Sequence, residues 1–358
     1  MWHVDPHAKM CTPDVQRAVP IKLACLCRQV RAQVDVPCSS FPLRAYICHS
    51  TASRHLSGLL CITFCNLPEG SSAIEVEGDT RSYDLDPNLS IVFCGQCGTP
   101  IYEESSVASG VKLHTGALSL DDTAVEFSGQ CCTDQTKDGG LSVWLDYPKT
   151  KDCMLHQPTA SVNRMDVSNK FPGINASCHC GGVKFTITPP SEGSSQISSP
   201  YSNLIVPAHA GSPKNEEDNK WWLRAKGTKY FAGTCACTSC RFASGNDVQT
   251  WAFVPKVNIR QIRGGPFEFH TGALKQYASS AGVYRNFCSI CSATVFWHSD
   301  RRPGLIDVST GLLEAESGAR AEELLEWATA RVSFQADAQN GAFITTLGEG
   351  LRKWGAWD

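Results

Sequence analysis

Residues 233–245 read GTCACTSCRFASG and bring three cysteines, Cys235, Cys237 and Cys240, into one short loop. Two close cysteine pairs flank this loop, at Cys178/Cys180 and at Cys288/Cys291. Cysteine thiolates bind zinc, and four of them close a structural site, whereas three leave one coordination position open for chemistry. The spacing therefore predicts two zinc ions in the second half of the chain: a structural zinc on the two pairs and an open zinc on the loop.

The first half of the chain repeats the two flanking pairs. The opening strand aligns as KLACLCRQVRAQVDV (22–36) with ASCHCGGVKFTIT (176–188), and the closing pair aligns as VFCGQCGTPIY (92–102) with NFCSICSATVF (286–296). The first copy therefore predicts a structural zinc site of its own, with the ligands Cys25, Cys27, Cys94 and Cys97.

The middle loop is where the two copies differ. YICHSTASRHLSG (46–58) aligns with residues 233–245 without a gap, and Cys48 falls on Cys235. Ser50 and Ser53, however, stand opposite Cys237 and Cys240, and serine is a poor zinc ligand. We expect one metal in the first copy and two in the second. A variant site in the first copy, built with His49 and His55 or with Cys61 and Cys65, stays open as an alternative.

Apolar residues recur at period two after each C-x-C, as expected of half-buried strands. They are Val30, Ala32 and Val34 in the first copy and Val183, Phe185 and Ile187 in the second. The pattern predicts a mainly β chain of two tandem zinc domains, at 20–150 and 174–335, with a linker at 151–173 and a tail at 336–358. The polar insertion 189–220 predicts a surface loop, and ARAEELLEW (319–327) has helical spacing.

Composition narrows the class of protein. The chain has 358 residues, a net charge of −3 and a pI of about 6.4, so no nucleic-acid surface is expected. The N-terminal stretch lacks an apolar signal-peptide core, and no apolar run is long enough for a membrane helix. A cytoplasmic or nuclear protein with reduced thiols is the simplest interpretation, and the 19 cysteines are an odd number, against a complete disulfide framework. The sequence leaves open the roles of Cys11, Cys38, Cys131, Cys132 and Cys153, most of which are read as incidental thiols.

Two alternatives stay open for the cysteine clusters. A distant histidine, His179, His270 or His298, could complete the three-cysteine loop as a second structural site. The C-x-x-C pairs could instead be redox-active, although such motifs usually sit in βαβ units.

Arg241 follows the loop and could bind an anionic substrate through bidentate hydrogen bonds. A structural role is at least as well supported, because Arg54 occupies the same place in the first copy.

These motifs resemble the glutathione-dependent formaldehyde-activating enzyme family, which also includes centromere protein V. The family pattern is C-x-C-G-x-V, C-x-C-x-x-C-R and F-C-x-x-C-G, and the second copy reads CHCGGV (178–183), CACTSCR (235–241) and FCSIC (287–291). The second copy departs from this pattern at Ser292 and at the insertion. The first copy departs from it throughout the middle loop. The resemblance implies a β-tent fold of stacked antiparallel sheets, a structural zinc on the two flanking pairs and a catalytic zinc on the loop.

The resemblance also implies a reaction. The family's named activity joins formaldehyde and glutathione to give S-hydroxymethylglutathione, which is carbon–sulfur lyase chemistry. We therefore expect an enzyme whose second domain holds the catalytic residues Cys235, Cys237 and Cys240, with a glutathione-like thiol and a small electrophile as substrates. The alternatives are an enzyme acting on a thioether metabolite and a non-catalytic, zinc-stabilised binding or adaptor module.

Overall fold

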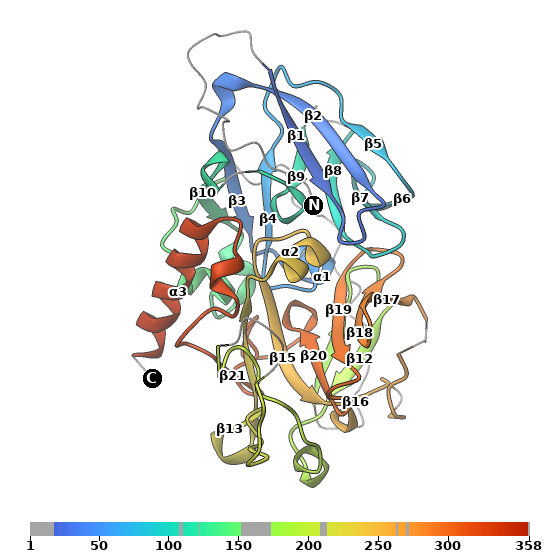
Figure 1. Cartoon of the computed structure of the whole chain (residues 1–358), viewed down its shortest axis with the longest axis vertical. Helices are drawn as coiled ribbons and strands as arrows, with labels where there is room; N and C mark the ends of the chain where they lie inside the picture. The colour runs from blue at the N-terminus through green and yellow to red at the C-terminus, as the bar shows by residue number, and fades with distance from the viewer. Residues whose placement is uncertain are drawn as a thin grey trace.

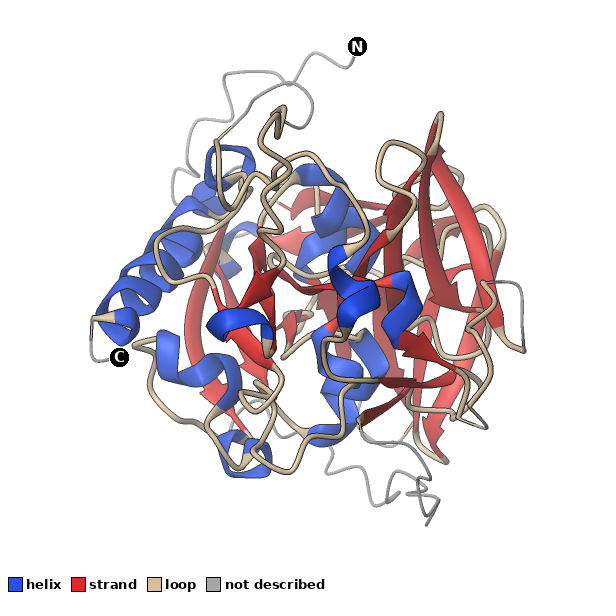
Figure 2. Ribbon diagram, turned by 90° about the horizontal axis from the view of Figure 1, so that it is seen from below, coloured by secondary structure: helices blue, strands red, loops and turns tan. Residues whose placement is uncertain are grey.

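A computed structural model describes residues 18–106, 110–120, 122–151, 173–207, 213–262, 264–269 and 272–356. Strands dominate in both halves of the chain, and the described residues form three α-helices, α1 (Thr51–Ser57), α2 (Thr238–Ser244) and α3 (Gly341–Gly355). Figure 1 shows the first half above the second, and Figure 2 shows α3 at one side of the molecule. The mainly β, tandem fold expected from the sequence is confirmed.

The first half contains two sheets. The smaller has the order β1-β2-β5 and the larger has the order β10-β3-β4-β9-β8-β7-β6. Neighbouring strands are antiparallel except β10 and β3, which are parallel. The strands are β1 (Ala18–Ala24), β2 (Arg31–Pro37), β3 (Leu43–Cys48), β4 (Ile62–Asn66), β5 (Glu75–Glu77), β6 (Thr80–Asp86), β7 (Leu89–Cys94), β8 (Pro100–Ser105), β9 (Val111–His114) and β10 (Val125–Cys131).

The second half repeats this arrangement. Its smaller sheet has the order β11-β12-β16, and its larger sheet has the order β13-β14-β15-β20-β19-β18-β17, with β21 parallel to β14. The strands are β11 (Ile174–Ser177), β12 (Lys184–Ile187), β13 (Leu223–Arg224), β14 (Lys229–Cys235), β15 (Gln249–Pro255), β16 (Ile259–Arg260), β17 (Leu274–Ser280), β18 (Val283–Cys288), β19 (Thr294–Ser299), β20 (Leu305–Ser309) and β21 (Leu325–Trp327). Apart from β13, each strand has a counterpart in the first half, in the same order across the sheet.

Alternating burial explains the paired opening strands. In β2, Ala32, Val34 and Val36 are buried while the residues between them are exposed. Phe185 and Ile187 of β12 are fully buried in the second half. Each buried valine, isoleucine or phenylalanine side chain contributes about 1.5–3 kcal/mol to folding, so the period-two pattern fixes which face of the strand meets the core.

The two halves exchange contacts reciprocally, and α1 and α2 lie in the middle of the view in Figure 1. The N–H of Gly116 donates to the carbonyl of Gly245 at the end of α2, and the N–H of Gly311 donates to the carbonyl of Gly58 at the end of α1. A Cβ on Gly116 would lie 2.2 Å from the Asn246 nitrogen, and one on Gly311 would lie 1.9 Å from the Leu59 oxygen. Only glycine allows this close approach of the two backbones.

The predicted helix at 319–327 is wrong. Ala321 has a φ of +50°, and Leu325–Trp327 form strand β21 beside β14. Leu324 and Leu325 are both buried, Leu324 on a turn and Leu325 on the strand. Their spacing from Ala321 therefore imitates the apolar face of a helix in a segment that is not helical. A non-local strand partner thus outweighs local helix propensity in this segment.

The C-terminal tail packs on the first half. Asn340 caps α3, accepting a hydrogen bond from the Phe343 N–H, and its side-chain amide donates to the Val125 carbonyl. Phe343 stacks on Phe127 with ring centroids 4.3 Å apart, and Trp354 lies edge-on to Trp144 at 5.7 Å. Helix α3 therefore packs against the first half as well as against the segment 329–335 that precedes it.

The insertion and the linker meet the structure only in part. Residues 152–172, most of the predicted linker, lie outside the described residues, as do 208–212 of the insertion. The described part of the insertion is packed rather than loose. Trp221 and Trp222 are buried beside it, and the Trp222 indole donates to the Ser194 carbonyl.

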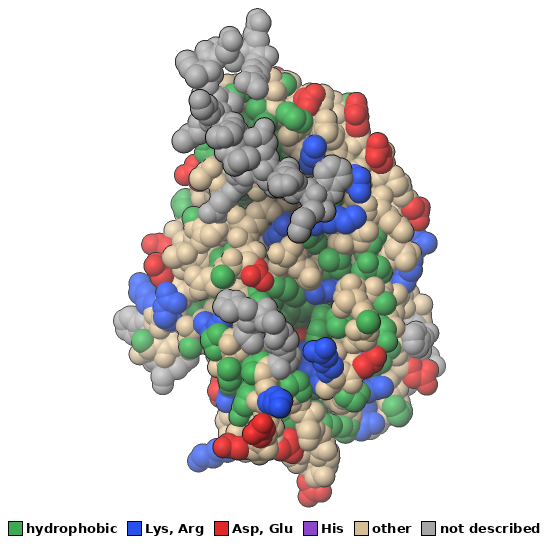
Figure 3. Space-filling model, in the orientation of Figure 1, with side chains coloured by type: hydrophobic (Ala, Val, Ile, Leu, Met, Phe, Trp, Pro, Cys, Tyr) green, Lys and Arg blue, Asp and Glu red, His purple; other side chains and the backbone are tan. Residues whose placement is uncertain are grey.

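The surface carries both signs of charge. On the face drawn in Figure 3, basic and acidic side chains are interspersed over both halves, in keeping with the net charge of −3. Among the described residues, no helix has the length and apolarity needed to cross a membrane.

Candidate metal centres

The four-cysteine sets assemble as the sequence predicts. In the second half the four sulfurs of Cys178, Cys180, Cys288 and Cys291 all lie within 4.8 Å of one another. The Cys178 and Cys180 sulfurs are 3.5 Å apart, and those of Cys180 and Cys288 are 3.4 Å apart. A tetrahedron with Zn–S bonds of about 2.3 Å has sulfurs about 3.8 Å apart, so the set is positioned to bind a metal ion.

The first half holds the equivalent set. The sulfurs of Cys25, Cys27, Cys94 and Cys97 also lie within 4.8 Å of one another. A backbone N–H faces the first sulfur of each set, from Val30 to Cys25 at 3.2 Å and from Val183 to Cys178 at 3.3 Å. Such donors stabilise thiolates, the form that binds metal.

The closing turns of the two sets carry different residues at their left-handed position. Gly98 has a φ of +79°, and a Cβ there would lie 2.4 Å from the Phe287 ring of the other half. Its counterpart Ser292, where the sequence departs from the family pattern, holds a φ of +66°. A left-handed serine costs on the order of 1 kcal/mol, which the surrounding turn sustains.

The three-cysteine loop is also assembled. Cys235 ends β14, Cys237 caps α2 by accepting a hydrogen bond from the Cys240 N–H at 3.3 Å, and Cys240 lies within the helix. The three sulfurs lie within 4.8 Å of one another, and no other histidine, cysteine or carboxylate joins them among the described residues. Trp251, Trp297 and Phe334 surround the group. The arrangement is positioned to bind a metal ion with three protein ligands.

Arg285 is the site residue that sequence reasoning missed. Both of its terminal nitrogens approach the Cys240 sulfur, at 3.7 and 3.8 Å, and the side chain is buried. Hydrogen bonds from Cys235 and Cys237, together with the Arg285 charge, hold the pKa of Cys240 well below its usual range. The available signal was the repeat itself, because the aligned residue in the first half is Ile91, and a buried strand arginine needs a counter-charge.

A second charged pair lies behind Arg285. Arg302 donates to Asp307 at 2.6 Å and lies over the Trp297 ring at 4.5 Å. Burial raises the pKa of Asp307 to about 6, although Arg302 opposes the shift. The second half thus buries two partnered arginines, Arg285 against the Cys240 sulfur and Arg302 against Asp307.

The histidines proposed as a fourth ligand lie elsewhere. His179 sits beside the four-cysteine set, where its Nδ1 bonds the Tyr83 hydroxyl at 2.9 Å. His298 packs between the rings of Tyr284 and Phe269. His270 lies outside the described residues. Neither described histidine joins the three sulfurs, so the closed-site alternative gains no ligand from them.

Arg241 has a structural position. One of its terminal nitrogens donates to the carbonyls of Gly116 and Leu118 in the first half, at 2.7 and 2.9 Å. The side chain is buried and its charge lies 4.0 Å from the Phe242 ring centroid. These contacts support the structural role over the substrate-binding role that the sequence also allowed.

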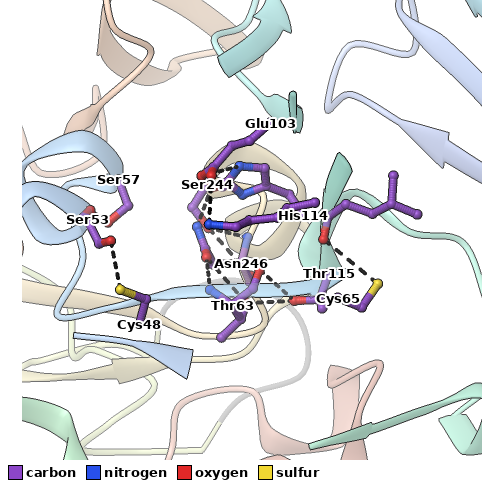
Figure 4. A network of polar contacts seen from close by, with 12 residues as sticks. Cys48, Ser53, Ser57, Thr63, Cys65, Glu103, His114, Thr115, Ser244 and Asn246 are labelled. Atoms are coloured by element: carbon purple, nitrogen blue, oxygen red, sulfur yellow. Dashed lines mark hydrogen bonds and ion pairs between the residues drawn. The ribbon is translucent and has the colours of Figure 1, made fainter. Parts of the chain in front are cut away.

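The middle loop of the first half has the same strand-to-helix backbone as that of the second, but only one of the three sulfurs, that of Cys48. Ser50 caps α1 by accepting a hydrogen bond from the Ser53 N–H at 3.0 Å, and the Ser53 hydroxyl donates to the Cys48 sulfur at 3.2 Å (Figure 4). His49 bonds Gln130 and His55 bonds the Ser177 carbonyl. Among the described residues, neither histidine belongs to a cluster of side chains that could hold a metal ion.

Two cysteines from a distant strand approach Cys48 instead. The sulfurs of Cys48, Cys131 and Cys132 lie within 4.8 Å of one another, whereas Cys61 and Cys65 join no such group in the described part of the chain. Cys131 is disulfide-bonded, and Cys48 and Cys132 are free thiols. Cys38 is also disulfide-bonded, so Cys38 and Cys131 are not among the incidental thiols that the sequence led us to expect for most of these cysteines.

A buried ionic group lies on the neighbouring strands of the first half. Lys112 Nζ is 3.5 Å from Glu103, and His114 Nε2 is 3.6 Å from the same carboxylate (Figure 4). Burial alone would raise the pKa of Glu103, but Lys112 and His114 outweigh it and lower that pKa to about 2. By strand pairing, Trp297, Asp307 and Ser309 of the second half stand where the first half has Glu103, Lys112 and His114, so this group is particular to the first half.

Comparison with known proteins bears on both halves. A family sequence model described as glutathione-dependent formaldehyde-activating enzyme matches residues 20–131 and 222–328. The second match leaves out Cys178 and Cys180, which precede the insertion, yet the structure brings both to Cys288 and Cys291. No curated protein matches the chain.

Proposed function

Because the chain belongs to the glutathione-dependent formaldehyde-activating enzyme family, we propose that it is a zinc-dependent carbon–sulfur lyase acting on a glutathione-like thiol and a small aldehyde. The observation that carries this proposal is the grouping of Cys235, Cys237 and Cys240, whose sulfurs lie within 4.8 Å of one another. Three thiolates on one zinc ion leave a coordination position for the sulfur of the substrate.

The reaction joins one thiol to one carbonyl carbon. Zinc held by the three cysteines would lower the pKa of the substrate thiol, so that the thiol reacts as a thiolate at neutral pH. The thiolate sulfur bonds to the carbonyl carbon, the carbonyl π electrons move to the oxygen, and that oxygen takes up the proton that the thiol lost. The product is a hydroxyalkyl thioether, and cleavage is the reverse of these steps.

Arg285 would compensate charge at this site. Three thiolates and one Zn²⁺ carry a net charge of −1, and a substrate thiolate adds a further negative charge. A buried guanidinium 3.7 Å from the Cys240 sulfur favours that accumulation of charge, because electrostatic interactions strengthen away from water. Arg285 is therefore proposed as a positioning residue that acts through Cys240.

The first half would act as a structural partner of the reactive loop. Arg241 extends from α2 to the Gly116 and Leu118 carbonyls, and Gly116 in turn bonds the Gly245 carbonyl at the end of α2. These contacts hold the helix that carries Cys240. We infer that the first half fixes the position of the loop without supplying a ligand to it.

Metal content and turnover, measured on the same variants, test the proposal. The full chain should hold three zinc ions, and Cys237→Ser should hold two, keep its fold and lose turnover of glutathione with formaldehyde by at least about a thousandfold. Ser50→Ala, at the aligned position of the first half, is the matched control and should keep three zinc ions and full activity.

Cobalt substitution separates catalysis from binding. With cobalt in place of zinc, adding glutathione should change the thiolate-to-metal absorption of the wild-type protein but not that of Cys237→Ser. Full activity in Cys237→Ser would refute the lyase assignment. A spectral change without turnover of any thiol–aldehyde pair would instead indicate the binding module.

A further inference from the structure

The middle loop of the first half, which has serines at the positions of two zinc ligands, lies beside the end of β10, and its Cys48 sulfur is close to that of Cys132. Strand β10 runs parallel to β3, with Cys131 paired to Cys48, and the His49 N–H donates to the Cys131 carbonyl at 3.0 Å. Cys132 follows with a φ of +56°, and its sulfur lies within 4.8 Å of the Cys48 sulfur. Both are free thiols and both are partly exposed. Two thiols so placed are close enough to form a disulfide after a small movement.

The two serines at the positions of the zinc ligands form a hydrogen-bonded chain that ends on the Cys48 sulfur. The Ser53 hydroxyl donates to Cys48 at 3.2 Å (Figure 4). The Ser50 hydroxyl in turn donates to Ser53 at 2.9 Å. Hydrogen bonds from Cys132 and Ser53 outweigh burial and lower the pKa of Cys48 to about 6. Thiolates are the reactive form of cysteine, so this geometry favours a nucleophile at position 48.

Two other free thiols, one just before β4 and one within it, have the opposite surroundings. Cys61 and Cys65 are fully buried, and burial raises the pKa of Cys65 to about 12. The hydrogen bond to Cys48 and burial also raise the pKa of Cys132 above its ordinary value, although Lys112 lowers it in part. Cys48 and Cys132 therefore have the unequal characters of an attacking thiolate and a resolving thiol.

We propose that Cys48 and Cys132 form a redox-active dithiol that reduces small, low-molecular-weight disulfides of the glutathione type. The Cys48 thiolate attacks one sulfur of the substrate disulfide, whose S–S bond breaks and releases the first thiolate. Cys132 then loses its proton and attacks the Cys48 sulfur, which releases the second thiolate. Two protein thiols are oxidised to one disulfide, and one substrate disulfide is reduced to two thiols.

This inference is independent of the proposed lyase activity. It uses the first half of the chain, where the aligned Ser50 and Ser53 cannot hold the metal that the lyase would need. Loss of the second-half zinc should leave it unchanged, so Cys237→Ser can be tested for both reactions.

The experiment uses the full zinc-loaded chain and glutathione disulfide. Wild type should form a Cys48–Cys132 disulfide without a lasting adduct, seen by non-reducing mass spectrometry and peptide mapping. Cys132→Ser should trap one glutathione on Cys48, and Cys48→Ser should trap none on Cys132. Cys65→Ser, which removes a buried thiol of the same sheet, is the matched control and should behave as wild type.

A milder variant protects the test against misfolding. Ser53→Ala removes one donor to the Cys48 sulfur and should slow alkylation of Cys48 by iodoacetamide at neutral pH about three- to tenfold. Equal alkylation rates at Cys48 and Cys65 would overturn the proposal. So would protection of Cys48 that only a chelator removes, since that result assigns a metal, or a mapped Cys48–Cys131 linkage, which excludes Cys132 as the resolving thiol.

Discussion

The two middle loops of this chain share one backbone and differ in their chemistry. Ser50 caps α1 in the first half as Cys237 caps α2 in the second, each accepting a hydrogen bond from the N–H three residues later. Both helices have seven residues and end on a left-handed glycine, Gly58 or Gly245. The cap and the glycine are present in both loops, although only one loop has three sulfurs. The comparison shows that the loop can keep its shape after its metal ligands are replaced.

The polar residues around each loop have changed with it. The second half places Arg285 against Cys240, whereas the first has Ile91 at the aligned position. The first half instead buries Glu103 with Lys112 and His114. Each loop thus has charged neighbours that its counterpart lacks, and the predictions below test how far those neighbours decide the chemistry.

Restoring the lost sulfurs should restore the metal. Ser50→Cys combined with Ser53→Cys places three cysteines on the α1 loop, whose caps already hold the required backbone. We expect elemental analysis to rise from three to four zinc ions per chain, since zinc bound to thiolates contributes about 10 kcal/mol or more. The double variant Ser50→Ala, Ser53→Ala is the control and should stay at three. A count of three in the cysteine variant would mean that more than the ligands has been lost.

The buried ionic group should matter to the stability of the first half. The pKa of Glu103 is lowered from 4.5 to about 2, so its stabilisation is complete above the unfolded-state value and is lost as the pH falls towards 2. Glu103→Gln should therefore lower the free energy of unfolding by about 3 kcal/mol at neutral pH, and the difference from wild type should shrink below about pH 4.5. Urea titrations across this range measure it, and a difference that does not depend on pH would contradict the assignment.

Copying the first half's residue into the second should impair catalysis without removing the metal. Arg285→Ile should keep three zinc ions and lower kcat/KM about thirtyfold or more, since one charge-assisted contact contributes about 2 kcal/mol. Arg285→Lys keeps the charge and should recover part of the activity. If the isoleucine variant were fully active, Arg285 would have only a packing role.

The smallest effect is expected at the cap that both loops share. Ser50→Ala removes the acceptor for the Ser53 N–H and should cost about 1 kcal/mol of stability, with zinc content and lyase activity unchanged. Thermal unfolding measures the loss. The loss of stability can be compared with that of Ser57→Ala, which removes a hydroxyl that donates to the Ser53 carbonyl at the other end of α1.

Local patterns predicted a large part of this molecule. The C-x-C and C-x-x-C pairs fixed both four-cysteine sets because their ligands lie within short turns. The period-two residues Val183, Phe185 and Ile187 are buried as expected. The tandem, mainly β fold follows from these repeats, and the family match covers both copies.

The errors lie where distant segments meet. Leu325 joins β14 as a parallel strand, which a helical spacing of apolar residues cannot reveal. Cys132 reaches Cys48 because β10 pairs with β3 across more than seventy residues of chain. Arg285 was missed because neighbours such as Phe287 made β18 look like an ordinary core strand, and only the folded structure shows the Cys240 sulfur beside it.

Helix α3 sets an order for the making of this protein. Phe343 and Trp354 complete the packing around Phe127 and Trp144, yet they lie more than two hundred residues further along the chain. Domains usually fold from the N-terminus as the nascent chain emerges. Here the first half cannot complete its packing before α3 has been synthesised, so we expect its apolar surface to stay accessible to chaperones while the second half emerges.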